Sequence, residues 1–429
     1  MAAFLAGAVL ATAVVAHAVP SRSRTASRDR YRTLDAFAES LSYILNQYVH
    51  PLDERKLVYA AIQGMVDQLD QHSSFLPPRR YQRLRQDTEG EFAGVGLTLG
   101  ANQRDGGPPV VEAVVSGSPA ARARVAVGDE VLTIDKRTTT PAGKDVGPKS
   151  WHSRLRGRAG TRVAIRVHHR GAAARDLTLV RELVKVPSVD WFFLEPGIGY
   201  VSVSKFQEAT SADARAALTA MVARSPAKRL RGLVLDLRGN PGGLLDQGIH
   251  TADLFLDHGT IATVGGRPGT PVERELAHSA GTFGGFPMVA LVDQGTASAA
   301  EIVAGALEDQ KRASIVGLPS FGKGSVQTFL DLRDGSGLKL TTAHYFTPSG
   351  RSLEGVGIKP DFEVEAFEAE DVMASGGDES EAGGDEPRPP PQRSGPGSWT
   401  KAMIRQRIEE DPQLRAAYQM VKARAGSKH

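Results

Sequence analysis

The chain has 429 residues, of which 41% are hydrophobic, 24% are charged and 6% are aromatic. This length and composition indicate a soluble globular protein of about two to four domains and exclude both a single small module and a polytopic membrane protein. The absence of cysteine excludes a disulfide framework, a thiolate metal site, an iron–sulfur cluster and a cysteine nucleophile. The net charge of +3 is too small to indicate nucleic-acid binding by itself.

The chain begins with an uncharged apolar stretch, residues 1–18, that ends in Ala16-His17-Ala18, a pattern that signal peptidases cleave. Because no lysine or arginine precedes it, a retained membrane anchor fits as well as a cleaved signal peptide. A buried N-terminal helix is a weaker alternative, since a polar segment follows at once. We assign residues 1–32 to this export segment and its linker, and expect a periplasmic protein that is either soluble or anchored to the inner membrane.

In residues 33–88, apolar side chains recur at helical spacing on both sides of the break HPLDE. The pattern predicts an N-terminal helical hairpin, closed by a turn at HSSFLPP, whose apolar faces pack on something larger. In residues 89–186 the pattern changes to short β-type runs separated by glycine and proline, which predicts a small β-rich domain. From residue 187 to 366 strands alternate with helices, which is typical of a layered α/β sheet domain.

A disordered linker is predicted over residues 367–397. Ten acidic residues and no lysine or arginine occur between Glu363 and Glu386, and the run PRPPPQRSGPG follows. The rest of the chain therefore carries +13, because 52 basic residues face the remaining 39 acidic ones. Residues 398–429 are apolar at helical spacing with a break at Pro412, which predicts a terminal helical segment. Adaptor docking and self-association are both open roles for this region.

The segment PMVALVDQGTASAAEIVAGALEDQ places Ser298 at the start of a helix, directly after an apolar strand and a turn. A hydroxyl there lies among unpaired backbone N–H groups at the positive end of the helix dipole, where donors can stabilise an oxyanion. Ser298 with Glu301 three residues later is also a capping box, and for an isolated pattern capping is the more common role.

Lys323 lies between Gly322 and Gly324, in a turn that separates two apolar strands. A lysine buried at such a place has a lowered pKa and can act as a general base, so a serine–lysine pair would need neither histidine nor cysteine. Gly317 and Gly322-Lys323 also begin a phosphate-binding loop. That motif then fails, because a glycine follows the lysine and a strand follows where a helix is required.

A third turn, from Gly239 to Gly243, follows the apolar strand LRGLVLDL and opens a helix. Its glycine N–H groups could supply a second oxyanion donor, although an ordinary strand-to-helix connection explains the turn equally well. No GxSxG motif is present, and no histidine has a catalytic motif around it. His344 fits a residue that packs beside a strand better than it fits a catalytic base.

Four runs together resemble the C-terminal processing peptidases, or tail-specific proteases, which use a Ser–Lys mechanism: LVLDLRGNPGGLL, LVDQGTASAAEIVAGALEDQKRASIVG, SFGKGSVQT and LTTAHYFTPSGRSLEGVGIKPD. The resemblance covers about residues 34–366. It implies a crotonase/ClpP-like α/β protease core with an inserted PDZ domain and an N-terminal helical hairpin.

The resemblance also implies the role of individual residues. Ser298 matches the nucleophile, Lys323 the general base and Gln327 the residue that holds the lysine. The oxyanion donors match Ala299 and one glycine of the pair Gly242 and Gly243, of which Gly243 is the better match. No metal or other cofactor is implied.

The β-rich segment resembles the family's PDZ domain, in which FAGVGLTL would be the carboxylate-binding loop. Consecutive N–H groups at Gly94, Val95, Gly96 and Leu97 would then hold a chain-terminal carboxylate while the peptide adds as a β-strand. Residues 122–185 contain fifteen basic and six acidic residues. This surplus favours carboxylate-bearing tails, or is simply a solvated basic face.

These observations predict an exported serine endopeptidase that recognises the C-terminal tails of protein substrates and cleaves near that end through an acyl-enzyme. No nucleic-acid partner is expected, whereas membrane anchoring through residues 1–18 stays open. Two alternatives from other classes are a PDZ scaffold or chaperone with an inactive protease core, and a crotonase-like acyl-CoA enzyme. The presence of all three catalytic residue types argues against the first, and the export signal and PDZ segment argue against the second.

Overall fold

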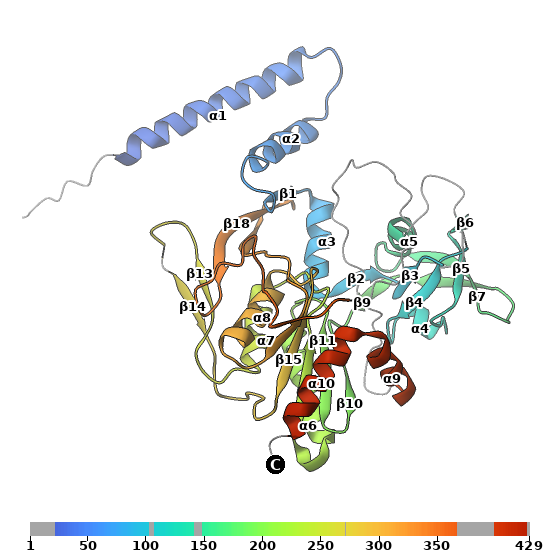
Figure 1. The fold of residues 1–429 in the computed structure, drawn as a ribbon. Helices are drawn as coiled ribbons and strands as arrows, with labels where there is room; N and C mark the ends of the chain where they lie inside the picture. Colours follow the sequence, from blue (N-terminus) through green and yellow to red (C-terminus); the bar gives the residue numbers. More distant parts are fainter. Residues whose placement is uncertain (1–21, 103–106, 141–147, 271, 367–398, 427–429) are drawn as a thin grey trace, which may run out of the picture. The chain divides into compact units, whose positions relative to one another are not determined.

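A computed structural model describes residues 22–102, 107–140, 148–270, 272–366 and 399–426 of the chain (Figure 1). The predicted export signal at residues 1–18 and nearly all of the predicted acidic linker lie outside the described residues. Contacts divide the chain into one unit that ends at Gln68 and a second that begins at Leu69. Within the part that the structure describes, no helix combines the length and the apolarity that crossing a membrane requires.

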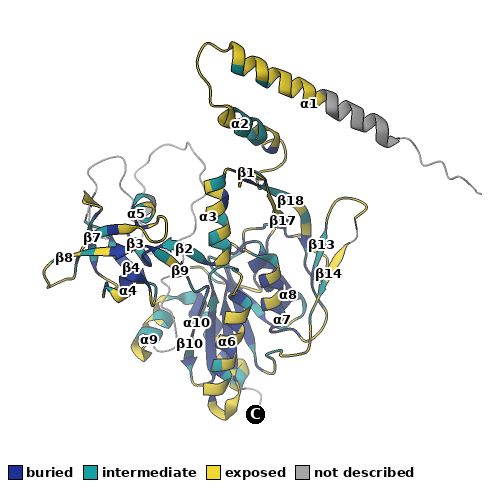
Figure 2. Cartoon of the chain, turned by 180° about the vertical axis from the view of Figure 1, so that it is seen from behind, coloured by how far each residue is buried: buried dark blue, intermediate teal, exposed yellow. Residues whose placement is uncertain are grey.

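The first unit contains two helices, α1 (Arg22–Gln47) and α2 (Glu54–Val66), separated at the break that the sequence predicts. Asp53 caps α2, because its carboxylate accepts a hydrogen bond from the N–H of Lys56. The large apolar side chains on these helices stay mostly exposed, for example Phe37 at 47% and Met65 at 63% (Figure 2). Packing of these faces on a larger partner, which the sequence predicts, is therefore not seen within the unit.

The second unit opens differently from the prediction. The segment HSSFLPP is not only a turn, because it contains the short strand β1 (Ser74–Leu76), which pairs with β18 (Gly337–Phe346). Helix α3 (Pro78–Glu89) follows and ends at Gly90, whose φ of +76° is the left-handed conformation that glycine adopts without steric cost.

The β-type region forms a sheet of its own around a separate hydrophobic cluster that includes Val111, Val131 and Ile134. The strand order is β3-β4-β5-β7-β8, with β6 on β5, while β2 pairs with β9 beside it. The elements are β2 (Glu91–Gly94), β3 (Leu97–Gly100), β4 (Val110–Val114), α4 (Pro119–Arg122), β5 (Glu130–Ile134), β6 (Arg137–Thr138), α5 (Pro148–Leu155), β7 (Arg162–His168), β8 (Arg175–Val180) and β9 (Glu182–Lys185).

The α/β region is built on a six-stranded sheet with the order β10-β11-β12-β15-β16-β19, in which all pairs except β10 with β11 are parallel. The strands are β10 (Val189–Glu195), β11 (Ile198–Val203), β12 (Gly232–Asp236), β15 (Met288–Val292), β16 (Ser314–Gly317) and β19 (Phe362–Glu363). The helices are α6 (Thr210–Arg224), the short 3₁₀ turn η1 (Pro226–Lys228), α7 (Leu245–Asp253) and α8 (Ala299–Asp309).

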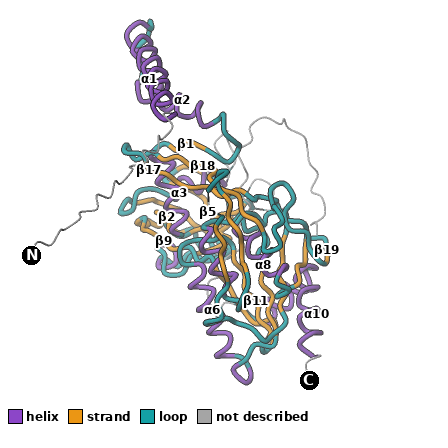
Figure 3. Tube along the Cα trace, turned by 90° about the vertical axis from the view of Figure 1, so that its left-hand side faces the viewer, coloured by secondary structure: helices purple, strands orange, loops and turns teal. Residues whose placement is uncertain are grey.

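Both faces of this sheet are buried, which explains why β12 and β15 are apolar at every position except the last residue of β12. Successive side chains point to opposite faces, so alternate residues enter two different cores. One core, under α6, α7 and α8, contains Val201, Val203, Leu233, Leu235, Ala290 and Val292. The other contains Ile198, Tyr200, Val234, Val289, Leu291 and Val316. Figure 3 shows the strands between α6 and α10.

The second core is closed by the C-terminal helices α9 (Lys401–Glu410) and α10 (Pro412–Gly426), which meet at the predicted break. Leu414, Ala417 and Val421 of α10 are completely buried against the sheet. Burying a leucine or valine side chain contributes about 1.5–3 kcal/mol, so α10 is an integral part of the core.

A second sheet carries part of the site. It contains β13 (Thr260–Gly265), β14 (Glu273–Leu276), β17 (Ser325–Asp331) and β18, in addition to β1. β17 and β18 form a long antiparallel hairpin. The sequence predicts a strand directly after Lys323, which is β17, whereas no individual strands are predicted at β13 and β14.

Candidate active site

Ser298 immediately precedes α8, as the strand–turn–helix pattern predicts. Its φ and ψ of +57° and −121° lie in a region that residues with a side chain rarely adopt. Such a conformation costs on the order of 1–3 kcal/mol and is maintained only where the surroundings enforce it, which is common at active sites. The strain therefore separates Ser298 from an ordinary helix cap.

Glu301 joins the serine turn to the lysine turn. The capping box is present, since the N–H of Ser298 donates to Oε2 of Glu301 at 2.8 Å. The same Oε2 accepts from the N–H of Lys323 at 2.9 Å, while Oε1 accepts from the N–H of Gly322 at 2.7 Å and from the hydroxyl of Ser320 at 2.5 Å. One fully buried carboxylate thus holds two loops that are more than twenty residues apart in sequence.

The pKa of Glu301 is raised by burial, although its four hydrogen bonds favour the charged form and oppose that increase. A carboxylate without these donors would be far more costly to bury. The arrangement shows that the sequence pattern Ser-x-x-Glu serves two purposes here: it caps the helix and it positions the lysine loop.

Lys323 lies between β16 and β17, as the sequence predicts. Its pKa is lowered by burial and by the positive charge of Lys339 on β18, while the carboxylates of Glu354 and Glu301 act in the opposite direction. The net effect favours the neutral amine, which is the form that a general base requires. A strand follows Lys323 instead of a helix, so the alternative of a phosphate-binding loop is wrong.

The glycine turn after β12 lies against the serine. A Cβ atom on Gly242 would be 2.7 Å from Cβ of Ser298 and 3.1 Å from the backbone nitrogen of Ala299, so only glycine fits there. The N–H of Gly242 already donates to Oδ1 of Asn240 at 2.9 Å. Among the hydrogen bonds of the described residues, none uses the N–H of Gly243 or of Ala299. These two donors are the ones left for a ligand.

Tyr345 and Gln327 complete the surroundings of the lysine loop. The hydroxyl of Tyr345 donates to the backbone carbonyl of Lys323. Burial and the negative charge of Glu301 raise the pKa of Tyr345, which therefore stays protonated. The side-chain nitrogen of Gln327 donates to Ser325 at 3.0 Å and to Thr341 at 3.4 Å.

Two features lie outside this group of residues. His344 is exposed on β18, where it pairs with Ser325 across the hairpin.

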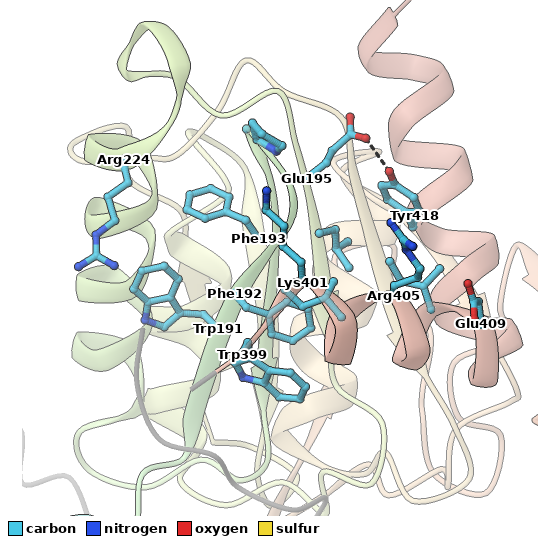
Figure 4. A pocket seen from close by; sticks show the side chains of 15 residues that line it. Trp191, Phe192, Phe193, Glu195, Arg224, Trp399, Lys401, Arg405, Glu409 and Tyr418 are labelled. Atoms are coloured by element: carbon cyan, nitrogen blue, oxygen red, sulfur yellow. Dashed lines mark hydrogen bonds between the residues drawn. The ribbon is translucent and has the colours of Figure 1, made fainter. Parts of the chain in front are cut away.

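A cavity of about 830 Å³ opens beside β10 and the terminal helices and is lined by aromatic residues such as Trp191 and Trp399 (Figure 4). None of the predicted site residues lines this cavity. It belongs to the docking of the C-terminal helices.

The predicted carboxylate-binding loop joins β2 to β3. The carbonyl of Val95 accepts from the N–H of Ala120 at 3.0 Å, and that of Gly96 accepts from the N–H of Val115 at 2.9 Å. In a trans peptide the N–H points away from the preceding carbonyl, so the N–H groups of Gly96 and Leu97 point away from these partners. The φ of +78° at Gly96, and a Cβ that would lie 2.2 Å from Ser118, require glycine in this loop.

The roles of three residues do not follow from the local sequence motifs. Ser-x-x-Glu predicts only a cap at Glu301, although a single carboxylate within the apolar run of α8 is itself a signal of a buried, hydrogen-bonded group. Tyr345 and Lys339 carry no such signal, because β18 reaches the lysine loop only through the pairing of the second sheet.

Comparison with known proteins identifies the family. Residues 197–364 match the model described as peptidase family S41. A carboxy-terminal-processing protease of Bartonella bacilliformis is 36% identical over 98% of this chain and 95% of its own length. A carboxyl-terminal-processing protease of Synechocystis sp. is 36% identical over 73% of each chain. A solved photosystem II D1 C-terminal processing protease is 32% identical, with a TM-score of 0.45, over 79% of this chain and 92% of that one.

The chain belongs to the carboxy-terminal-processing proteases of peptidase family S41, and it is a serine-type peptidase. The predicted family and enzyme class are thereby confirmed.

Proposed function

We propose that this protein is an exported endopeptidase in which Ser298 and Lys323 form a catalytic dyad, and that a PDZ domain delivers the C-terminal tail of a protein substrate to it. The observation that carries the dyad is the carboxylate of Glu301, which binds the N–H of Ser298 and the N–H of Lys323 with the same oxygen. Two loops that supply a nucleophile and a base are thereby held at one point.

In the first step, the neutral amine of Lys323 takes the proton of the Ser298 hydroxyl as Oγ attacks the carbonyl carbon of the scissile peptide. The resulting ammonium then gives this proton to the departing amine, which leaves an acyl group on Oγ. In the second step, Lys323 takes a proton from water, and the hydroxide formed attacks the ester. Collapse of this intermediate returns the proton from Lys323 to Oγ of Ser298 and releases the new C-terminal carboxyl group, which gives its remaining proton to solvent.

The oxyanion of each tetrahedral intermediate would accept hydrogen bonds from the N–H groups of Ala299 and Gly243. Both groups lack a partner among the described residues, whereas the N–H of Gly242 is taken by Asn240. Gly242 contributes space instead, because any side chain there would collide with Ser298. The first turn of α8 adds the favourable end of its dipole.

Gln327 would position the lysine rather than react. Its amide nitrogen donates to Ser325 and Thr341, which orients the amide. The amide oxygen is the atom that would accept a hydrogen bond from the ammonium of Lys323. Tyr345 supports the same loop through its hydrogen bond to the carbonyl of Lys323.

Tail recognition would use the loop from Gly94 to Leu97 in a PDZ domain formed by residues 89–186. The N–H groups of Gly96 and Leu97 would hold the terminal carboxylate, and the tail would add to the edge of β3 as a further strand. Basic residues outnumber acidic ones by fifteen to six in residues 122–185, which favours a carboxylate ligand. Export through residues 1–18 would place this activity in the periplasm.

The decisive experiment compares the wild-type chain with Ser298→Ala and Lys323→Ala on a protein substrate that carries a free, unstructured C-terminal tail. We expect each variant to lose at least about 10³-fold in kcat, because residues of a catalytic unit are removed. Mass spectrometry of the products locates the cleavage near the tail. Wild-type rates in either variant would overturn the dyad, and equal cleavage of a substrate with an amidated tail would overturn tail recognition.

A further inference from the structure

The strand that would receive the tail has one open edge. β3 lies at the end of its sheet, and its only strand partner among the described residues is β4. The carbonyl of Gly96 faces β4, because it accepts from Val115. Since backbone groups alternate in direction along a strand, the N–H of Leu99 points to the opposite, open edge. A peptide adding to β3 would need this donor.

The open edge is not empty. Helix α5 packs beside β3, and Nε2 of His152 on this helix accepts a hydrogen bond from the N–H of Leu99 at 3.1 Å. The Nε2 atom is an acceptor only when the imidazole is neutral, with its proton on Nδ1. Burial and the positive charge of Arg156 lower the pKa of His152, which maintains this neutral form.

We propose that His152 is a gate in the tail-binding groove: its imidazole occupies the strand-edge donor of Leu99 that a substrate tail must take, so tail binding requires the imidazole to move away. The inference rests on the proposed tail recognition and deepens it. In the free protein, His152 therefore blocks the groove beside β3. A tail replaces one internal hydrogen bond with a ladder of hydrogen bonds along β3, and only a peptide that forms several of them displaces the gate.

Removing the imidazole of His152 should increase the affinity of the protein for a substrate tail. A backbone hydrogen bond to a side chain contributes about 0.5–1.5 kcal/mol, so His152→Ala should bind a tail about fivefold more tightly. His152→Gln keeps an acceptor oxygen at similar reach and should bind like the wild type. Ser153→Ala is the matched control on the same helix, because Ser153 is exposed and its hydroxyl donates, among the described residues, to the carbonyl of Ser150 on its own helix.

Binding is measured with the full-length chain in a Ser298→Ala background. The probe is a fluorescein-labelled decapeptide that ends in two valines with a free carboxylate, and its amidated form is the control. Tighter binding of the carboxylate probe by His152→Ala alone supports the gate. Equal or weaker binding by His152→Ala, with the carboxylate still preferred over the amide, overturns the gate and leaves tail recognition intact. No preference for the carboxylate in any variant overturns tail recognition and the gate together.

A measurement without any substitution gives a second test. In hydrogen exchange of the free wild-type chain, the amide of Leu99 should be protected, as a bonded N–H is. It should stay protected when the probe is bound, and it should lose protection in free His152→Ala. An unprotected Leu99 amide in the free wild type overturns the gate whatever the variants do.

Discussion

Arg238 and Asp411 are 173 residues apart in the sequence and form an ion pair in which Nη2 lies 2.7 Å from Oδ2. Arg238 also binds Asp236 at the end of β12 and donates to Gln413 at 2.9 Å. It directly precedes the turn that runs from Gly239 to Gly243. The start of α10 is thereby attached to the strand end from which this glycine turn begins.

Removing this attachment should destabilise the protein. Asp411→Ala leaves the largely buried guanidinium of Arg238 with unsatisfied donors, which costs about 1–3 kcal/mol of unfolding free energy. Urea denaturation followed by circular dichroism measures the change. The control is Glu409→Ala, since Glu409 is exposed on α9 and forms no ion pair among the described residues. Identical midpoints for both variants would show that the ion pair contributes nothing.

Gly242→Ala should abolish most of the activity. The new Cβ would lie 2.7 Å from Cβ of Ser298 and 2.8 Å from the carbonyl of Ala297, and the φ of +96° adds strain. Because the proposed oxyanion donors, the N–H groups of Gly243 and Ala299, lie on either side of this contact, we expect kcat to fall by about 10²-fold or more.

The matched control lies in the same turn. Gly239 also has a positive φ, of +63°, but a Cβ there would have no atom of the described residues within 4 Å. Gly239→Ala should therefore lose about 1 kcal/mol of stability and keep kcat within about threefold of the wild type. Equal losses of kcat in both variants would attribute the effect to backbone strain rather than to the contact with Ser298.

Glu301→Gln should lower kcat/KM by about 10- to 100-fold. A glutamine side chain has one acceptor oxygen, and an NH₂ group replaces the other oxygen of Glu301. This NH₂ group faces two hydrogen-bond donors, either the N–H groups of Ser298 and Lys323 or the Ser320 hydroxyl and the Gly322 N–H, and it cannot accept from them. The two loops can then no longer be held at one point. Steady-state kinetics on a tailed peptide measures the loss.

Glu308→Gln, on the same helix, serves as the comparison for Glu301→Gln. Glu308 forms an ion pair with Arg351 and touches neither loop. Its variant should retain wild-type kinetics. A comparable loss in Glu308→Gln would point to helix destabilisation as the common cause.

The pH dependence should respond in opposite directions to two charge changes near Lys323. Under the proposed mechanism, activity should rise with pH as Lys323 loses its proton, because only the neutral amine can act as the base. The positive charge of Lys339 lowers the pKa of Lys323, so Lys339→Met should raise that pKa and move the acid limb to higher pH. The carboxylate of Glu354 raises the pKa, so Glu354→Gln should move the limb to lower pH.

The measurement is kcat/KM from neutral to alkaline pH for the wild type and both variants. Gln at position 354 can still accept the hydrogen bond that Glu354 receives from the N–H of Gly324 at 2.8 Å, so the loop keeps its support. Shifts of both limbs in the same direction would rule out a titrating Lys323 as the source of the profile.

Local sequence patterns were sufficient to predict those features whose geometry depends on one secondary-structure element or turn. The strand–turn–helix around Ser298 and the glycine turn around Lys323 are short-range features, and burial on both faces of β12 and β15 is visible as an uninterrupted apolar run. The helix predicted to start at Ser298 begins one residue later, at Ala299, and strands alternate with helices in the core as predicted. The family motifs added the order of these parts.

Contacts between distant segments could not be derived in this way. The sequence predicts only that Glu301 caps α8. The tertiary fold brings the N–H groups of Gly322 and Lys323 to the carboxylate oxygens of Glu301, where they donate hydrogen bonds. The same holds for α10, whose apolar spacing predicts a helix but not the strand faces that it covers.

Composition, periodicity and turn chemistry are properties of neighbouring residues, so the sequence alone determined the kinds of elements and the residue types capable of serine–lysine chemistry. Which backbone N–H groups remain without a partner, how Lys339 and Glu354 tune the lysine, and that His152 occupies the edge of β3 depend on contacts across the sheets. Hydrogen bonding and burial act through space, and only the tertiary structure decides which groups meet there.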